Sequence, residues 1–155
     1  MADANKKEVE KFLKFLHNSQ EKIYTEMGKT LVKACALIQR DAQESMRDTQ
    51  IDTTKTYYTH NKSKAHHPSV AGYPPAVDTG TLRRSITYQV DENKLEGEVG
   101  SVITNPPYGA YLELGTTMDG KQLMKPRPWL QPAIDRNIGQ LKQMVGNTIK
   151  VVIQK

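Results

Sequence analysis

A carboxylate lies between aromatic side chains in the stretch PPYGAYLELGT at residues 106–116. Glu113 follows Tyr108 and Tyr111, and a general acid or base needs such a carboxyl together with a partner group and a pocket. The nearest acidic residue in the sequence is Asp119, and no histidine is close. The pattern therefore favours a structural role for Glu113 over a catalytic one.

The structural alternative for Glu113 is an ion pair. The arginines available for it are Arg83, Arg84 and Arg127. We expect such a pair to fasten the helix that carries Glu113 to the segment around Arg127.

Three histidines, His60, His66 and His67, share one polar segment and raise the question of a metal site. Metal-binding histidines usually act with cysteine or carboxylate ligands at fixed spacings, and neither CxxC nor HExxH occurs. A solvated loop is the favoured interpretation.

The single cysteine, Cys35, excludes an intramolecular disulfide and indicates a reducing compartment. It falls in an apolar stripe, which favours a small buried side chain. With neither a phosphate-binding glycine loop nor a nucleophile elbow, we expect no enzyme, no cofactor and no metal.

The net charge of +5 over 155 residues is mildly basic. Trp129 is more typical of a core anchor than of a base-stacking platform.

No apolar run approaches the ~20 residues that cross a bilayer, and the N-terminus lacks the apolar segment of a signal peptide. We therefore expect a soluble protein without membrane contact. A basic patch facing a polyanion is possible, although a solvated surface is favoured; its members would be Lys62, Lys64, Arg83, Arg84, Lys121, Lys125 and Arg127.

Residues 5–48 contain no proline and one glycine, Gly28, and their apolar residues recur at steps of three and four. This pattern predicts one amphipathic helix of about 65 Å, whereas a compact domain of this length has a radius of gyration of about 15 Å. The helix either breaks, near residues 17–20 or at Gly28, or projects and needs a neighbour to cover its stripe.

Residues 49–77 read as an extended loop that is functional or ordered by a partner, and 53–58 as a candidate strand within it. Residues 78–155 predict an α+β body. Its first elements are a helical turn capped by Asp78 or Thr79 and a β-hairpin over 86–90 and 95–102. A short helix follows, with Asn105 as candidate N-cap, Pro106 in the first position and Gly115 as C-cap. After a loop at 118–125 comes a C-terminal helix with Pro132 in its first turn, and residues 151–153 either continue it or leave as a strand. We expect a single domain, 1–155, of α+β class: a long N-terminal helix, a small antiparallel sheet built around the hairpin, a middle helix and a C-terminal helix.

Three stretches, YPPAVDTGTLRRSI (73–86), YGAYLELGT (108–116) and KPRPWLQPAI (125–134), together resemble one family. Its signatures are P-P-x-x-x-T/D-G-x-L-R-x-S-I, Y-A-x-Y-x-E-x-G-T and x-P-A-R-P-F-L-x-P-A. The family is the tail-component group of long-tailed bacteriophages, typified by the gene-ten product of a lambdoid phage. Residues 73–134 carry the resemblance, and the long helix agrees in architecture. Residues 49–72 and 118–123 are longer than the family pattern.

The resemblance implies a virion structural protein of the neck or upper tail, made in the bacterial host cytoplasm, that joins or completes the tail at the head–tail interface without catalysis. It implies a ring of identical subunits, hexameric or dodecameric, beside head-completion or connector proteins and tail-terminator or tail-tube proteins, with packaged DNA a possible contact. A basic nucleic-acid-binding accessory protein is the alternative. The residues we expect at interfaces, or else in the core, are Tyr108, Tyr111, Glu113, Arg127, Trp129, Arg83 and Arg84.

Overall fold

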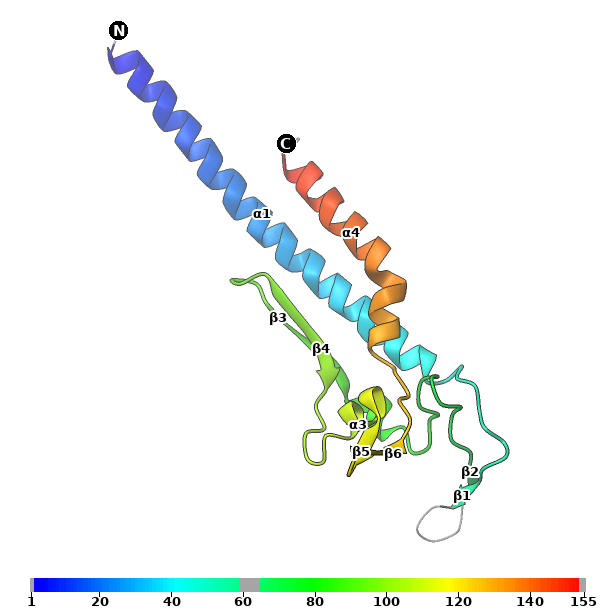
Figure 1. Ribbon diagram of the computed structural model, residues 1–155. Helices are drawn as coiled ribbons and strands as arrows, with labels where there is room; N and C mark the ends of the chain where they lie inside the picture. Colours follow the sequence, from blue (N-terminus) through cyan, green and yellow to red (C-terminus); the bar gives the residue numbers. More distant parts are fainter. Residues whose placement is uncertain (1, 59–64, 154–155) are drawn as a thin grey trace. The chain divides into compact units, whose positions relative to one another are not determined.

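The computed structural model (Figure 1) describes residues 2–58 and 65–153. The elements run in the order α1 (Ala2–Ser45), β1 (Tyr57–Tyr58), β2 (Ala65–His66), α2 (Thr81–Ser85), β3 (Ile86–Asp91), β4 (Glu96–Ser101), α3 (Tyr108–Leu114), β5 (Thr116–Met118), β6 (Lys121–Met124) and α4 (Gln131–Ile153). The strands of the described residues pair as β1–β2, β3–β4 and β5–β6. The predicted α+β class, with its long first helix, hairpin, middle helix and last helix, is confirmed.

The chain groups into two compact units. Unit 1 contains residues 1–35, 89–98 and 139–155, and unit 2 contains 36–88 and 99–138. The expectation of a single domain remains a prediction.

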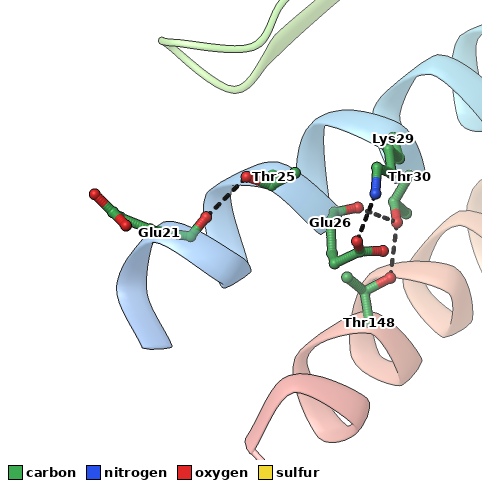
Figure 2. Close-up of polar contacts among 6 residues, drawn as sticks. All are labelled: Glu21, Thr25, Glu26, Lys29, Thr30 and Thr148. Atoms are coloured by element: carbon green, nitrogen blue, oxygen red, sulfur yellow. Dashed lines mark hydrogen bonds and ion pairs between the residues drawn. The ribbon is translucent and has the colours of Figure 1, made fainter. Parts of the chain in front are cut away.

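In unit 1 the N-terminal part of α1 lies beside α4, which runs in the opposite direction (Figure 1). Thr30 and Thr148 meet between these helices, with their hydroxyl oxygens 2.7 Å apart (Figure 2). Each hydroxyl also lies within hydrogen-bond distance of a carbonyl four residues earlier on its own helix, at 2.8 Å for Thr30 and 2.9 Å for Thr148. Because two hydroxyl groups have only two protons, one of these three contacts is always given up.

The hairpin turn of unit 1 packs against α1 through glycines. A Cβ added at Gly97 would lie 2.6 Å from Cys35 Sγ, and one at Gly28 would lie 3.0 Å from Glu92 Cγ. The approach at Gly97 leaves no room for a side chain, whereas at Gly28 the exposed Glu92 side chain would have to move by a few tenths of an ångström. Burial raises the pKa of the Cys35 thiol, as expected of a small core side chain.

The core of unit 2 is aliphatic around one tryptophan. Two glutamines of α1 hold the junction between α2 and β3: Gln39 Nε2 donates to the Ile86 carbonyl at 2.7 Å and Gln43 Nε2 to the Arg83 carbonyl at 3.1 Å. The buried apolar side chains of this unit are Ile38, Ala42, Met46, Leu82, Ile86, Leu112, Trp129 and Ala133. The α1 stripe therefore continues from unit 1 into this core.

Several sequence-based boundaries need correction. Helix α1 runs without a break over Ala2–Ser45, so neither residues 17–20 nor Gly28 interrupts it. Helix α3 has Pro107 as its N-cap rather than Asn105, and its predicted C-cap, Gly115, is confirmed. Helix α2 has Gly80 as its N-cap in place of Asp78 or Thr79. Helix α4 continues to Ile153, so the last apolar residues stay helical.

The described parts of the 49–77 loop, residues 49–58 and 65–77, run antiparallel to each other. Thr49 Oγ1 donates to the Pro74 carbonyl at 2.5 Å, Val70 N to the Gln50 carbonyl at 2.8 Å, and Ile51 pairs with Ser69. Of the strand expected at 53–58, only β1 forms, because the Asp52 carboxylate accepts the Thr54 N–H and hydroxyl and makes a turn there.

Candidate interface around the central helix

Glu113, near the C-terminal end of α3, caps the start of α4. Its Oε2 accepts the backbone N–H groups of Trp129 at 2.6 Å and Leu130 at 2.9 Å, and its Oε1 accepts that of Gln131 at 3.0 Å. The first turn of a helix has unpaired N–H groups and a partial positive charge, which a carboxylate satisfies on both counts. Glu113 thus joins two helices that are separated in the sequence by the β5–β6 hairpin.

The expected ion pair between Glu113 and an arginine does not form in the described part of the chain. Glu113 does fasten α3 to the segment after Arg127, but through backbone N–H groups. The arginines contact carbonyl oxygens elsewhere: Arg127 Nε donates to Ser69 at 3.2 Å and Arg84 Nη1 to Thr79 at 3.0 Å. Arg83 is half-buried and lies at the end of α2.

Trp129 has an exposed fraction of 3 % and lies in the core of unit 2. Its Nε1–H donates to the Gly109 carbonyl at 3.0 Å, which satisfies the one polar group of the indole. A Cβ at Gly109 would lie 3.1 Å from Ser101 Cβ and 3.3 Å from both Leu82 Cδ1 and Trp129 Cζ2. The glycine therefore lets α3 approach the indole closely.

Arg127 and Gly115 hold the surrounding segments together. The Arg127 N–H donates to the Leu112 carbonyl at 2.7 Å, while the Gly72 N–H donates to the Pro126 carbonyl at 2.9 Å. Gly115 has φ 75° as the C-cap of α3, and a Cβ there would lie 2.6 Å from the Met124 carbonyl oxygen. The residues of the second and third motifs thus fix α3, the end of β6, the start of α4 and the loop relative to one another within unit 2.

The tyrosines of α3 lie on the outside of this arrangement. Tyr108 is 49 % and Tyr111 43 % exposed, while the neighbouring Leu112 is buried. Tyr57 and Tyr58 on β1 are also exposed. Side chains of this type, rigid and amphipathic, are enriched at the centres of protein interfaces.

A second apolar surface lies on α1 in unit 1. Val9, Phe12, Leu13 and Leu16 have exposed fractions between 46 % and 59 %. They fall on one helix face at steps of three and four, and they continue the stripe that Cys35 and later residues bury. This face offers a hydrophobic surface to another chain.

The histidines do not assemble a ligand set in the described residues, where no group of three or more histidine, cysteine or acidic side chains is suited to a metal ion. His66 Nδ1 lies 4.0 Å from Asp78 Oδ1, and His67 Nδ1 lies 2.9 Å from the Lys55 carbonyl oxygen. His60 of the same segment lies outside the described residues, as do Lys62 and Lys64 of the suggested basic patch.

Sequence reasoning missed several residues that organise the site. Asp41 Oδ2 accepts from Arg136 Nε at 3.1 Å and Asn137 Nδ2 at 2.8 Å, which ties α1 to the start of α4 in unit 2. No periodicity marks this link. The role of Gly109 could have been read from the family signature. The signature has alanine at the position of Gly109 and phenylalanine at the position of Trp129. In this chain the helix residue is therefore smaller where the aromatic side chain is larger.

Comparison with known proteins gives the family. A family model described as "Bacteriophage HK97-gp10, putative tail-component" matches residues 10–115, more than half of the chain. The protein therefore belongs to the HK97 gp10-like family of putative bacteriophage tail components, as the three motifs indicated. The match includes most of α1, the loop, the first motif and all but the last residue of the second, and it stops before the KPRPWLQPAI stretch.

No match was found among curated proteins or among solved structures. Among the described residues, no helix is long and apolar enough to cross a membrane. Membership of a tail-component family implies a virion protein that contacts other virion proteins.

Proposed function

We propose that this tail component is a non-enzymatic structural protein of the neck or upper tail, whose subunits assemble head to tail into a closed ring, a hexamer or a dodecamer. The ring joins or completes the tail at the head–tail interface, between head-completion or connector proteins and tail-terminator or tail-tube proteins. The observation that carries the proposal is the apolar face of α1 from Val9 to Leu16, which is exposed in unit 1 although the same stripe is buried farther along the helix.

Two different surfaces support a ring over a symmetric dimer. Unit 1 offers the α1 face, and unit 2 offers the tyrosines Tyr108 and Tyr111. When one chain carries two unlike patches, copies join head to tail, and the chain of contacts closes if the rotation per subunit permits. Glu113, Trp129 and the Arg127 backbone N–H serve this surface indirectly, because their contacts hold α3 in place.

The experiment is native mass spectrometry of the purified chain, alone and with candidate neck and tail proteins from the same phage. We expect one discrete oligomer, alone or on addition of the correct neighbour. A chain that stays monomeric in every mixture contradicts the proposal. Titration with duplex DNA at increasing salt tests the nucleic-acid alternative, because phosphate contacts make affinity fall steeply with salt.

A further inference from the structure

Unit 2 contains a groove of about 550 Å³ between the 49–77 loop, α3 and the end of β6. Three cationic side chains line it, Lys55, Lys125 and Arg127, against one carboxylate, Asp52. Its volume lies in the range of pockets that hold a drug-sized ligand. We call this surface the basic groove.

The charge of the basic groove is largely available to a partner. Lys125 is exposed and has no ion pair or hydrogen bond with the described residues, and Arg127 uses only Nε, toward the Ser69 carbonyl. Lys55 Nζ lies 3.5 Å from Asp52 Oδ2. Hydrogen bonds from Thr54 hold the pKa of Asp52 below its usual value, so this carboxylate stays ionised at neutral pH. The groove nevertheless keeps a net positive charge.

The rest of the basic groove resembles the centre of an interface. Tyr57 and Leu123, exposed by 59 % and 67 %, and Tyr108 line it beside the cations. Ser69 also lines it, and the Ser69 hydroxyl is buried without a hydrogen-bond partner in the described residues. Aromatic and apolar side chains next to unpaired cations favour a protein segment that carries carboxylates over a bare polyanion.

Unit 1 of the same chain has a segment of opposite charge. Residues 91–98, the β3–β4 turn with its flanking positions, contain four carboxylates and one lysine, a net charge of −3. Glu96 and Glu98 are exposed two positions apart on β4, so their side chains lie on one face about 7 Å apart. Glu96 makes no hydrogen bond or ion pair with the described residues, and Glu98 accepts one bond, from Gln89 at 2.6 Å.

Residues 91–98, which we call the acidic turn, have a defined shape. Asp91 Oδ1 accepts the N–H groups of Asn93 at 3.0 Å and Lys94 at 3.2 Å, and Leu95 has φ 54°. A turn held by its own hydrogen bonds loses little conformational freedom when it is bound.

We propose that the acidic turn of one subunit docks in the basic groove of the next. Glu96 and Glu98 pair with Lys125 and Lys55, while the tyrosines of the groove contact the hairpin. The inference rests on the proposed ring and names the two surfaces that form its repeating contact. Because each subunit has one turn and one groove, the contact is head to tail and repeats around the ring.

The test uses the full chain with charges reversed on one side at a time. The turn variant is Glu96→Lys with Glu98→Lys, and the groove variant is Lys55→Glu with Lys125→Glu. Arg127 is left intact because it holds the loop. All four side chains are exposed, so the melting temperature should stay close to that of the parent. Matched controls reverse exposed charges elsewhere: Glu44→Lys with Asp48→Lys, and Lys142→Glu with Lys150→Glu.

Sedimentation velocity at about 0.1 M salt should show that each variant associates at least about tenfold more weakly than the parent, while the controls associate normally. Mixing the turn variant with the groove variant should restore an oligomer in which the two variants alternate, because every junction between unlike variants then joins opposite charges. Combining all four substitutions in one chain should restore the oligomer.

Three results overturn the inference. If the parent forms its oligomer and both variants do so equally well, the ring stands and the docking contact is wrong. If the parent never associates, the proposed ring fails, and the contact with it. If Lys55→Glu with Lys125→Glu weakens duplex DNA binding while association is unchanged, the groove is a nucleic-acid site.

Discussion

A single carboxylate fixes the relation between α3 and α4. Glu113→Ala removes three charge-assisted hydrogen bonds and leaves the N–H groups of Trp129, Leu130 and Gln131 without their acceptor. We expect the free energy of unfolding to fall by about 2–3 kcal/mol, and the melting temperature by about 5–10 °C, measured by circular dichroism.

The Glu113→Gln variant separates charge from hydrogen bonding, because the amide keeps one acceptor oxygen. Its loss should be roughly half as large. Glu44→Ala is the control, since that carboxylate is exposed, lies outside the proposed docking contact and makes no side-chain bond with the described residues. If Glu113→Ala and Glu44→Ala melt at the same temperature, the capping role is wrong.

The contact between Gly109 and Trp129 predicts energetic coupling. Gly109→Ala inserts a methyl group 3.3 Å from Trp129 Cζ2 and should destabilise by about 1–3 kcal/mol. Trp129→Phe removes that ring atom, so the double variant should be more stable than the sum of the single losses predicts, by about 0.5–1 kcal/mol. Urea unfolding of all four proteins measures the coupling. Strict additivity would contradict it.

At this scale the sequence indicated which residues matter but not what they touch. Residue types and spacing selected Glu113, Arg127 and Trp129, and the motif order placed them together. The partners of Glu113 were predicted wrongly, because a backbone N–H group has no sequence signature and an arginine does. The buried Ser69 was missed for a related reason, since a serine in a polar loop looks like a solvated one.

Among the elements, α4 contains two glycines that nothing in the described chain requires. A Cβ at Gly139 or Gly146 would meet nothing within 4 Å, and both positions are helical. Gly139→Ala and Gly146→Ala should each stabilise the chain by about 0.5–1 kcal/mol, because alanine loses less backbone entropy in a helix.

Gly97→Ala in the acidic turn is the contrast to these helix variants. Its Cβ would lie 2.6 Å from Cys35 Sγ, so we expect a lower melting temperature. Thermal melts followed at 222 nm rank the three variants. Gly97→Ala melting above Gly139→Ala would show that the packing of the hairpin against α1 is misread.

Elements with a strong period were predictable, and those determined by distant contacts were not. The stripe of α1 and the alternation in 86–90 gave the first helix and the hairpin. The β5–β6 hairpin lies where the sequence predicted a loop at 118–125, although Asp119 and Gly120, with φ 52° and 73°, form a turn that an Asp-Gly pair signals. The strand at 53–58 was overextended, because alternation alone does not reveal that the Asp52 side chain turns the chain.

For the whole molecule, the family assignment fixes the setting and the surfaces suggest the mechanism. A tail component contacts other virion proteins, and the two units expose different surfaces: the α1 face and acidic turn in unit 1, and the tyrosines and basic groove in unit 2. Polar contacts hold each unit together within the subunit. A single subunit therefore presents these surfaces before it assembles with its neighbours.

The α1 face gives the test at this scale. Leu13 and Leu16 are exposed by 57 % and 46 %, so Leu13→Glu with Leu16→Glu removes little contact within the chain, and the melting temperature of the dilute protein should change by less than about 2 °C. In an oligomer the two introduced glutamate carboxylates would be buried without partners. This burial costs several kcal/mol per contact, which is about enough to abolish association at micromolar concentration. The matched control is Lys11→Gln with Lys14→Gln on the opposite helix face, since it lowers the net charge by the same two units. Native mass spectrometry should show monomer for the leucine variant and the parent oligomer for the control. An oligomer that survives both changes would mean that another surface carries the ring and that the exposed stripe of α1 binds elsewhere in the particle.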